Sequence, residues 1–203
     1  MTAAEIANLF TGPDGTYRFA RWGRSIAPVV FGVDDATLPI LKGAIEAVVT
    51  LARHRMAETD PELGANLMLF FVKDWDELEG VPDLGRLVGD VPTLVARLSG
   101  SNQYRTFRFE EAGSIKACFS FVRLDEELAA MSAEAVALSL AVSAILCWSE
   151  RAFAERSALA EGPEGVILNP EVAEVIRASY DPVMPSSTTD ASHALRLAAR
   201  IGS

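Results

Sequence analysis

The longest apolar stretch of the chain, residues 135–148, is interrupted only by two serines. A helix that crosses a bilayer needs about 20 apolar residues, so this shorter stretch predicts a helix buried in a protein core. Ser132 before it is a suitable N-cap, and Gly162 and Pro163 after it are suitable stop signals. We therefore expect a long buried helix over residues 133–158, packed against a sheet.

The expected sheet comes from short strand-like segments. Residues 65–72, ANLMLFFV, form a continuous apolar run of a length typical of a buried strand. In the segment that begins at Ile115, apolar and polar residues alternate. Ile115, Ala117, Phe119 and Phe121 are expected on one face of the strand, and Lys116, Cys118 and Ser120 on the other. Gly113 before this segment predicts a turn, and therefore an antiparallel hairpin with residues 103–109.

The order of these segments indicates the fold class. Further strands are expected at 17–22 and 26–33, and further helices at 36–56, 170–179 and 188–201. One or two short helices, broken near Pro92, are expected within 84–98. We see no internal repeat, low-complexity tract or linker. The sequence therefore predicts one α+β domain over residues 1–203. It should hold a single mixed sheet of about four to five strands, packed against the long helix (133–158) and C-terminal helices.

The charge of the chain bears on its partners. The formal net charge is −10, which argues against a nucleic-acid-binding or anionic-membrane surface. Arg18, Arg21 and Arg24 form a short basic cluster that we interpret as a solvated face. The segment MTAAEIANLF lacks the basic and long apolar regions of a signal peptide. If Met1 is the native start, we expect a cytoplasmic protein; if the natural chain begins earlier, export stays open.

Few residues suit metal or nucleophilic chemistry. The chain has two histidines, so a zinc site of three histidines is excluded. We expect His54, between two arginines, and His193, beside Asp190, to lie on the surface. Cys118 and Cys147 have apolar neighbours, which raise a thiol pKa and make the thiol inert. A disulfide between them is left open.

Residues 149–153, Ser-Glu-Arg-Ala-Phe, have the spacing of the zinc-peptidase motif His-Glu-x-x-His with both histidines replaced. On a helix, the neighbours of Glu150 one turn away would be apolar, among them Leu146 and Phe153. A buried carboxylate must be hydrogen-bonded there, because an unpaired buried charge is costly. Two interpretations stay open: Glu150 marks the point where the helix leaves the core, or it is the remnant of a general base.

Four segments carry a resemblance that spans nearly the whole chain. They are RFARWGRSIAPVVFGV at 18–33, ANLMLFFVKDWDEL at 65–78, CFSFVRLDEE at 118–127, and IRASYDPVMPSSTTDASHALRLAARI at 176–201. Their order and spacing resemble a bacterial zincin-like, metallopeptidase-fold domain family of unknown function.

The resemblance implies that the helix before the Tyr-Asp-Pro segment is an active-site helix. Glu150 then matches the glutamate that activates a metal-bound water, as a relic general base. Ser149 and Phe153 occupy the two ligand positions. A serine hydroxyl is a poor zinc ligand and phenylalanine cannot be one, so we expect no zinc and no other cofactor.

The same resemblance suggests what remains of a cleft. Tyr180 and Asp181 of the Tyr-Asp-Pro segment are expected near it, together with Met184. Met184 is placed like the methionine of the turn in some zinc peptidases. Without a metal beside it, packing in a core or turn is the better interpretation of that residue.

Three functions remain. The first is a non-catalytic, pseudo-peptidase domain that binds a peptide or protein, for example by adding a strand at an exposed sheet edge. The second is a metal-dependent hydrolase with an unusual ligand set drawn from Glu150, Glu155, Asp181 and His193. The third is a structural or oligomerisation domain. The ligand, the pathway and the oligomeric state are not predicted by the sequence.

Overall fold

Four strands form the central sheet of the computed structural model, which describes residues 1–163 and 165–201. Strands β2 (Pro28–Phe31), β3 (Leu67–Val72) and β5 (Ile115–Arg123) run parallel, and β4 (Gln103–Phe109) pairs antiparallel with β5. The order β2-β3-β5-β4 leaves β2 and β4 at the two edges. The α+β class with a mixed sheet is therefore confirmed, as is the hairpin of β4 and β5.

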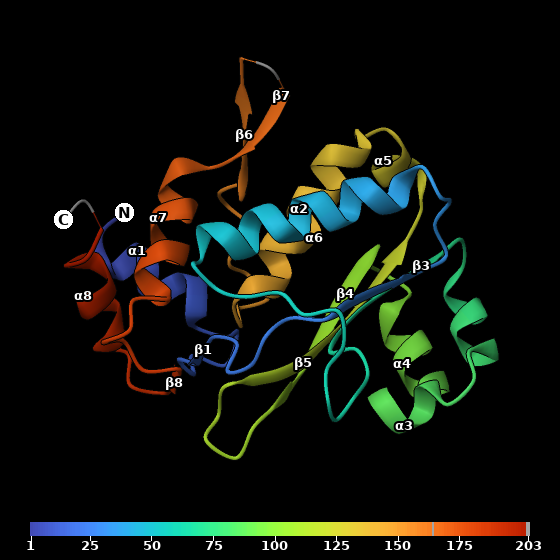
Figure 1. The fold of residues 1–203 in the computed structure, drawn as a ribbon, viewed down its shortest axis with the longest axis horizontal. Coiled ribbons are helices and arrows are strands. Elements are labelled where there is room, and N and C mark those ends of the chain that lie inside the picture. The colour runs from blue at the N-terminus through green and yellow to red at the C-terminus, as the bar shows by residue number, and fades with distance from the viewer. Residues whose placement is uncertain (164, 202–203) are drawn as a thin grey trace.

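Helices cover both faces of the sheet (Figure 1). On one face, α2 (Thr37–Leu51) and α6 (Ala133–Ile145) lie side by side and contribute to the larger of two hydrophobic clusters. On the other face, a smaller cluster holds side chains of η1 (Trp75–Gly80), α3 (Leu84–Val88) and α4 (Val91–Leu98). Both faces of the sheet are thus buried, as the continuous apolar run in β3 predicts.

The alternation expected in β5 is interrupted at its first residues. Ala117 and Phe119 face the smaller cluster, but Ile115 packs with Cys118 in the larger one. The cause is a β-bulge: Arg108 pairs with Ala117 and Phe109 with Ile115, which leaves Lys116 as an extra residue in β5. The expectation that Ile115 shares a face with Ala117 is therefore wrong.

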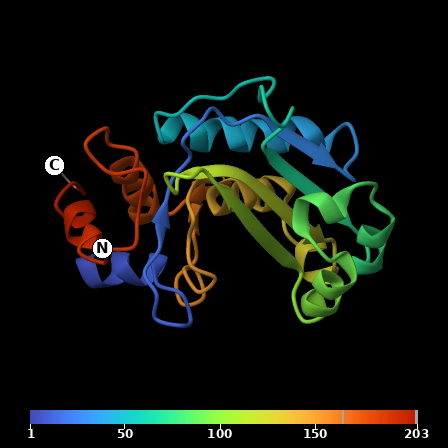
Figure 2. The same ribbon diagram turned by 90° about the horizontal axis from the view of Figure 1, so that it is seen from below.

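The two ends of the chain meet at one end of the molecule, opposite α3 and α4 (Figure 2). There α1 (Ala3–Phe10), α7 (Pro170–Ser179) and α8 (His193–Ala198) gather around both termini. The Met1 amino group lies 3.1 Å from a carboxylate oxygen of Glu171. The final helix is shorter than the expected 188–201.

The remaining elements are small. They are β1 (Phe19–Ala20), α5 (Glu126–Ala129), β6 (Leu159–Gly162), β7 (Gly165–Leu168) and β8 (Ser187–Thr188). β1 pairs with β8, and β6 pairs with β7 in a hairpin that projects from the body of the molecule (Figure 1). No helix in the described ranges is long and apolar enough to cross a membrane.

The expected long helix 133–158 is wrong at its C-terminal end, because α6 stops at Ile145. Leu146 is extended and forms an isolated bridge with Arg21. The amide of Cys147 then donates to the Ala20 carbonyl at 2.9 Å, and that of Ser149 donates to the Leu9 carbonyl at 2.8 Å. Main-chain partners from the N-terminal segment therefore replace the helical hydrogen bonds that residues after 145 would otherwise make.

Three aromatic side chains satisfy carbonyl groups at this helix end. The indole of Trp148 donates to the Val142 carbonyl at 2.7 Å, and that of Trp22 donates to the Ala144 carbonyl at 2.8 Å. The Tyr180 hydroxyl donates to the Ile145 carbonyl at 2.8 Å. The last carbonyls of a helix lack intrahelical partners, so these donors fix the point at which α6 ends.

Candidate functional site

A groove of about 570 Å³ lies along β4, and it is within the size range of small-ligand sites. Consecutive residues of β4 from Gln103 to Phe107 line it, which places the groove at the edge of the strand. Its other walls come from α4, from α6 and from the segment after α6. The residues of these last two parts are Leu140, Ser143, Cys147, Trp148 and Glu150.

The main chain of β4 leaves hydrogen-bonding groups at this edge. The amide of Arg123 donates to the Asn102 carbonyl at 2.8 Å, so Asn102 and Arg123 form a hydrogen-bonded pair. Such pairs alternate along an antiparallel ladder. The N–H and C=O groups of Gln103, Arg105 and Phe107 therefore point away from β5. Within the described ranges, no other main-chain group is bonded to them.

Arg105 occupies the middle of this edge. It pairs with Ser120 of β5 and is half-buried. Its Nη2 donates to the Trp148 carbonyl at 3.0 Å. Burial lowers the pKa of the guanidinium, and the nearby Cys118, Cys147 and Glu150 act in the opposite sense. An arginine stays charged even so, and the groove therefore holds a poorly solvated positive charge.

Two more arginines line the groove. Arg18 places its guanidinium carbon 3.8 Å from the ring centre of Phe109, and Arg97 enters from α4. In the part of the chain that the structure describes, neither forms an ion pair, and nor does Arg105. Glu150 is the one carboxylate among the described lining residues.

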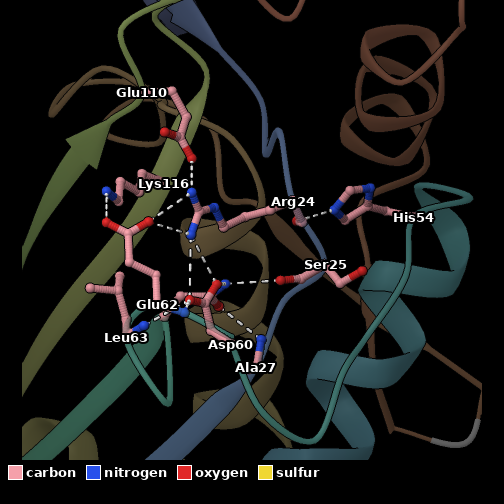
Figure 3. Close-up of polar contacts among 10 residues, drawn as sticks. Arg24, Ser25, Ala27, His54, Asp60, Glu62, Leu63, Glu110 and Lys116 are labelled. Carbon is pink, nitrogen blue, oxygen red and sulfur yellow. Dashed lines mark hydrogen bonds and ion pairs between the residues drawn. The ribbon is translucent and has the colours of Figure 1, made fainter.

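A second cluster of charged residues shows the opposite arrangement (Figure 3). The Arg24 guanidinium lies among Asp60, Glu62 and Glu110, and Lys116 pairs with Glu62. Asp60 is buried, which would raise its pKa, but hydrogen bonds from the amides of residues 63 and 62, from Arg24 and from Asn66 lower it to about 2.

Each charge of this second cluster has an opposite charge beside it, and the cluster ties the loop before β3 to the β4–β5 hairpin. Its role is therefore structural. The basic cluster of Arg18, Arg21 and Arg24 does not form one solvated face, because Arg24 lies in this network and Arg18 lines the groove.

The residues of the degenerate zinc motif lie in a turn and not on a helix. Ser149 is buried, and its hydroxyl donates to the Thr11 carbonyl at 2.8 Å. Phe153 packs edge-on against Trp148. Glu150 is exposed at the groove. Because α6 ends at Ile145, before Glu150, the apolar neighbours expected one helical turn from Glu150 do not apply.

Tyr180, Asp181 and Met184 are occupied elsewhere. Tyr180 is buried at the end of α6, and Asp181 pairs with Arg200 at 3.1 Å. Met184 is buried, and its carbonyl accepts from Arg21 at 3.2 Å. None of the three is among the described residues that line the groove beside Glu150.

Both histidines differ from the expected surface positions. His193 is 2% exposed, with its Nδ1 2.9 Å from the Tyr17 hydroxyl, and burial lowers its pKa to about 4. His54 is half-buried and donates to the Arg24 carbonyl at 2.8 Å. Tertiary packing at the end of α2 and the start of α8 covers faces that looked polar in the sequence.

The two thiols and the expected metal ligands do not form a reactive or metal-binding site in the described residues. Cys118 and Cys147 are free, and burial raises the pKa of Cys118 to about 12 and also raises that of Cys147. Across residues 1–163 and 165–201, no group of three or more His, Cys, Asp or Glu side chains is placed to hold a metal ion.

Comparison of the chain with models of protein families, with curated proteins and with solved structures finds no match. The site is therefore defined by its geometry. Sequence reasoning missed Arg105 as a site residue, because an arginine within a strand usually faces solvent. The available signal was weak: two arginines alternate with aromatic residues in QYRTFRF, inside a strongly acidic chain.

Proposed function

We propose that the chain is a non-catalytic binding domain that takes up an extended segment of a peptide or protein along β4. The outward-facing main-chain groups of Gln103, Arg105 and Phe107 carry this proposal. An extended peptide can add a strand to such an edge, and its main-chain hydrogen bonds then supply affinity. The groove beside the edge gives room for the side chains of the incoming segment.

The zincin-like relationship is part of the same proposal, and it rests on the four sequence segments described above. Ser149 and Phe153, at the positions of the two metal ligands, are used for a main-chain hydrogen bond and for packing. Glu150 remains at the groove without these ligands. A binding role agrees with this arrangement better than hydrolysis does.

The test is a matched pair of substitutions at Gln103. Short random peptides displayed on phage are selected against the protein, and the recovered peptides are synthesised. Gln103→Ala keeps the outward N–H, and we expect binding to be retained. Gln103→Pro removes that N–H while leaving the ladder with β5 intact, because proline is tolerated on an edge strand; we expect binding to be lost.

Amide NMR shifts give the location independently. The peptides should perturb the amides of Gln103, Arg105 and Phe107 first. If no binder is recovered, or if the shifts map to another surface and Gln103→Pro binds normally, the proposed function is wrong.

A further inference from the structure

Arg105 has no ion-pair partner among residues 1–163 and 165–201. Its guanidinium donates one hydrogen bond within these ranges, to the neutral carbonyl of Trp148. A desolvated charge is costly unless it is paired, and Arg24 is an example of the paired arrangement in this chain, with three carboxylates around it. The guanidinium of Arg105 can therefore form an ion pair with an anion that enters the groove.

Arg18 strengthens this arrangement. Its guanidinium is stacked over Phe109, which holds the planar group in place while its N–H edges remain available. Neutral hydroxyl groups of Ser120 and Ser143 also line the groove. Arginine guanidinium groups recognise carboxylates through two parallel hydrogen bonds, so this group of residues matches a carboxylate in both charge and shape.

We propose that Arg105 and Arg18 form an anion subsite that binds a carboxylate of the extended segment, which makes the ligand class an acidic peptide. This inference rests on the proposed function. An added strand turns alternate side chains to the same face, so an acidic side chain beside Arg105 would face the same groove. Arg97 adds positive charge at the wall formed by α4.

The experiment is a double-mutant cycle between protein and peptide. The probes are a peptide of alternating valine and glutamate with blocked ends, its counterpart with glutamine in place of glutamate, and the glutamine peptide with a free C-terminal carboxylate. The first and third probes distinguish a side-chain carboxylate from a terminal one. Each is titrated against the native protein, Arg105→Gln, Arg18→Gln and Arg86→Gln by calorimetry.

We expect Arg105→Gln to weaken binding of the glutamate peptide by about thirtyfold, the loss typical when one partner of a close charge pair is truncated. Binding of the glutamine peptide should change little. The Arg86 side chain is 83% exposed on α3 and is not among the described residues that line the groove. Arg86→Gln removes the same charge there, and its effect should be less than about twofold. Glu150→Gln should tighten binding, because it removes the carboxylate that competes for the arginines.

The outcomes separate the two proposals. If the glutamate and glutamine peptides bind the native protein equally well, or if Arg105→Gln and Arg18→Gln weaken both equally, the anion subsite is wrong and peptide binding survives. If no peptide binds but glutarate does, and Arg105→Gln abolishes glutarate binding, the anion subsite is supported and strand addition is wrong. Arg18→Gln provides a second test if Arg105→Gln folds poorly.

Discussion

Two arginines of this chain have opposite surroundings, and their substitution should change stability in opposite directions. Arg105 lacks a carboxylate ion-pair partner in the described ranges. Because an unpaired, poorly solvated charge destabilises the folded state, we expect Arg105→Met to raise the free energy of unfolding by about 1 kcal/mol. Arg24→Met should lower it by about 2 kcal/mol, because it leaves the buried Asp60 without its cationic partner. Urea unfolding of both variants measures the two changes. A loss of stability in Arg105→Met comparable to that in Arg24→Met would show that Arg105 is a structural residue.

At the scale of an element, the end of α6 depends on side chains far away in the sequence. Tyr180→Phe removes the donor to the Ile145 carbonyl and the acceptor of a 3.3 Å bond from the Trp22 amide. We expect a loss of about 1–2 kcal/mol, since buried polar groups are left unpaired. Tyr104→Phe makes the same chemical change on half-buried β4, where the described residues give its hydroxyl no partner, and should cost less than about 0.5 kcal/mol. Equal unfolding midpoints for the two variants in urea would contradict this role for Tyr180.

The same helix shows how far the sequence leads. The start of α6 at Ala133 follows from the Ser132 cap, and β4 follows from the turn at Gly113, which predicts a hairpin of residues 103–109 with the next strand. The end of α6 does not follow from a local signal, because it depends on the Ala20 and Leu9 carbonyls rather than on nearby residues. The candidate site likewise depends on contacts between residues that are far apart in the sequence. The groove could be predicted only as an exposed sheet edge, whereas the surroundings of Arg105 required the tertiary structure.

At the scale of the whole molecule, His193 couples stability to pH at the junction of the two chain ends. It packs 4.2 Å from the Phe19 ring, between centroids, and its buried Nε2 has no partner among the described residues. Burial, followed by the charge of Arg196, lowers its pKa to about 4, while Asp190 acts in the opposite sense. In the unfolded chain, the pKa is about 6.5, so between these two values the unfolded state binds more protons.

Stability should therefore fall as the pH falls from about 6.5 to about 4, by about 3 kcal/mol. Asp60 acts in a separate window, because its pKa of about 2 in the folded chain makes its contribution disappear only below about pH 4. The free energy of unfolding, measured by urea titration at intervals between pH 7 and pH 4, should show the first loss in the native protein. Burial also lowers the pKa of His54, so His54→Gln should reduce this loss, but by less than His193→Gln. In His193→Gln, most of this loss should be absent. A loss of the same size in His193→Gln would show that other groups cause the pH dependence, and that His193 at the junction of the chain ends does not.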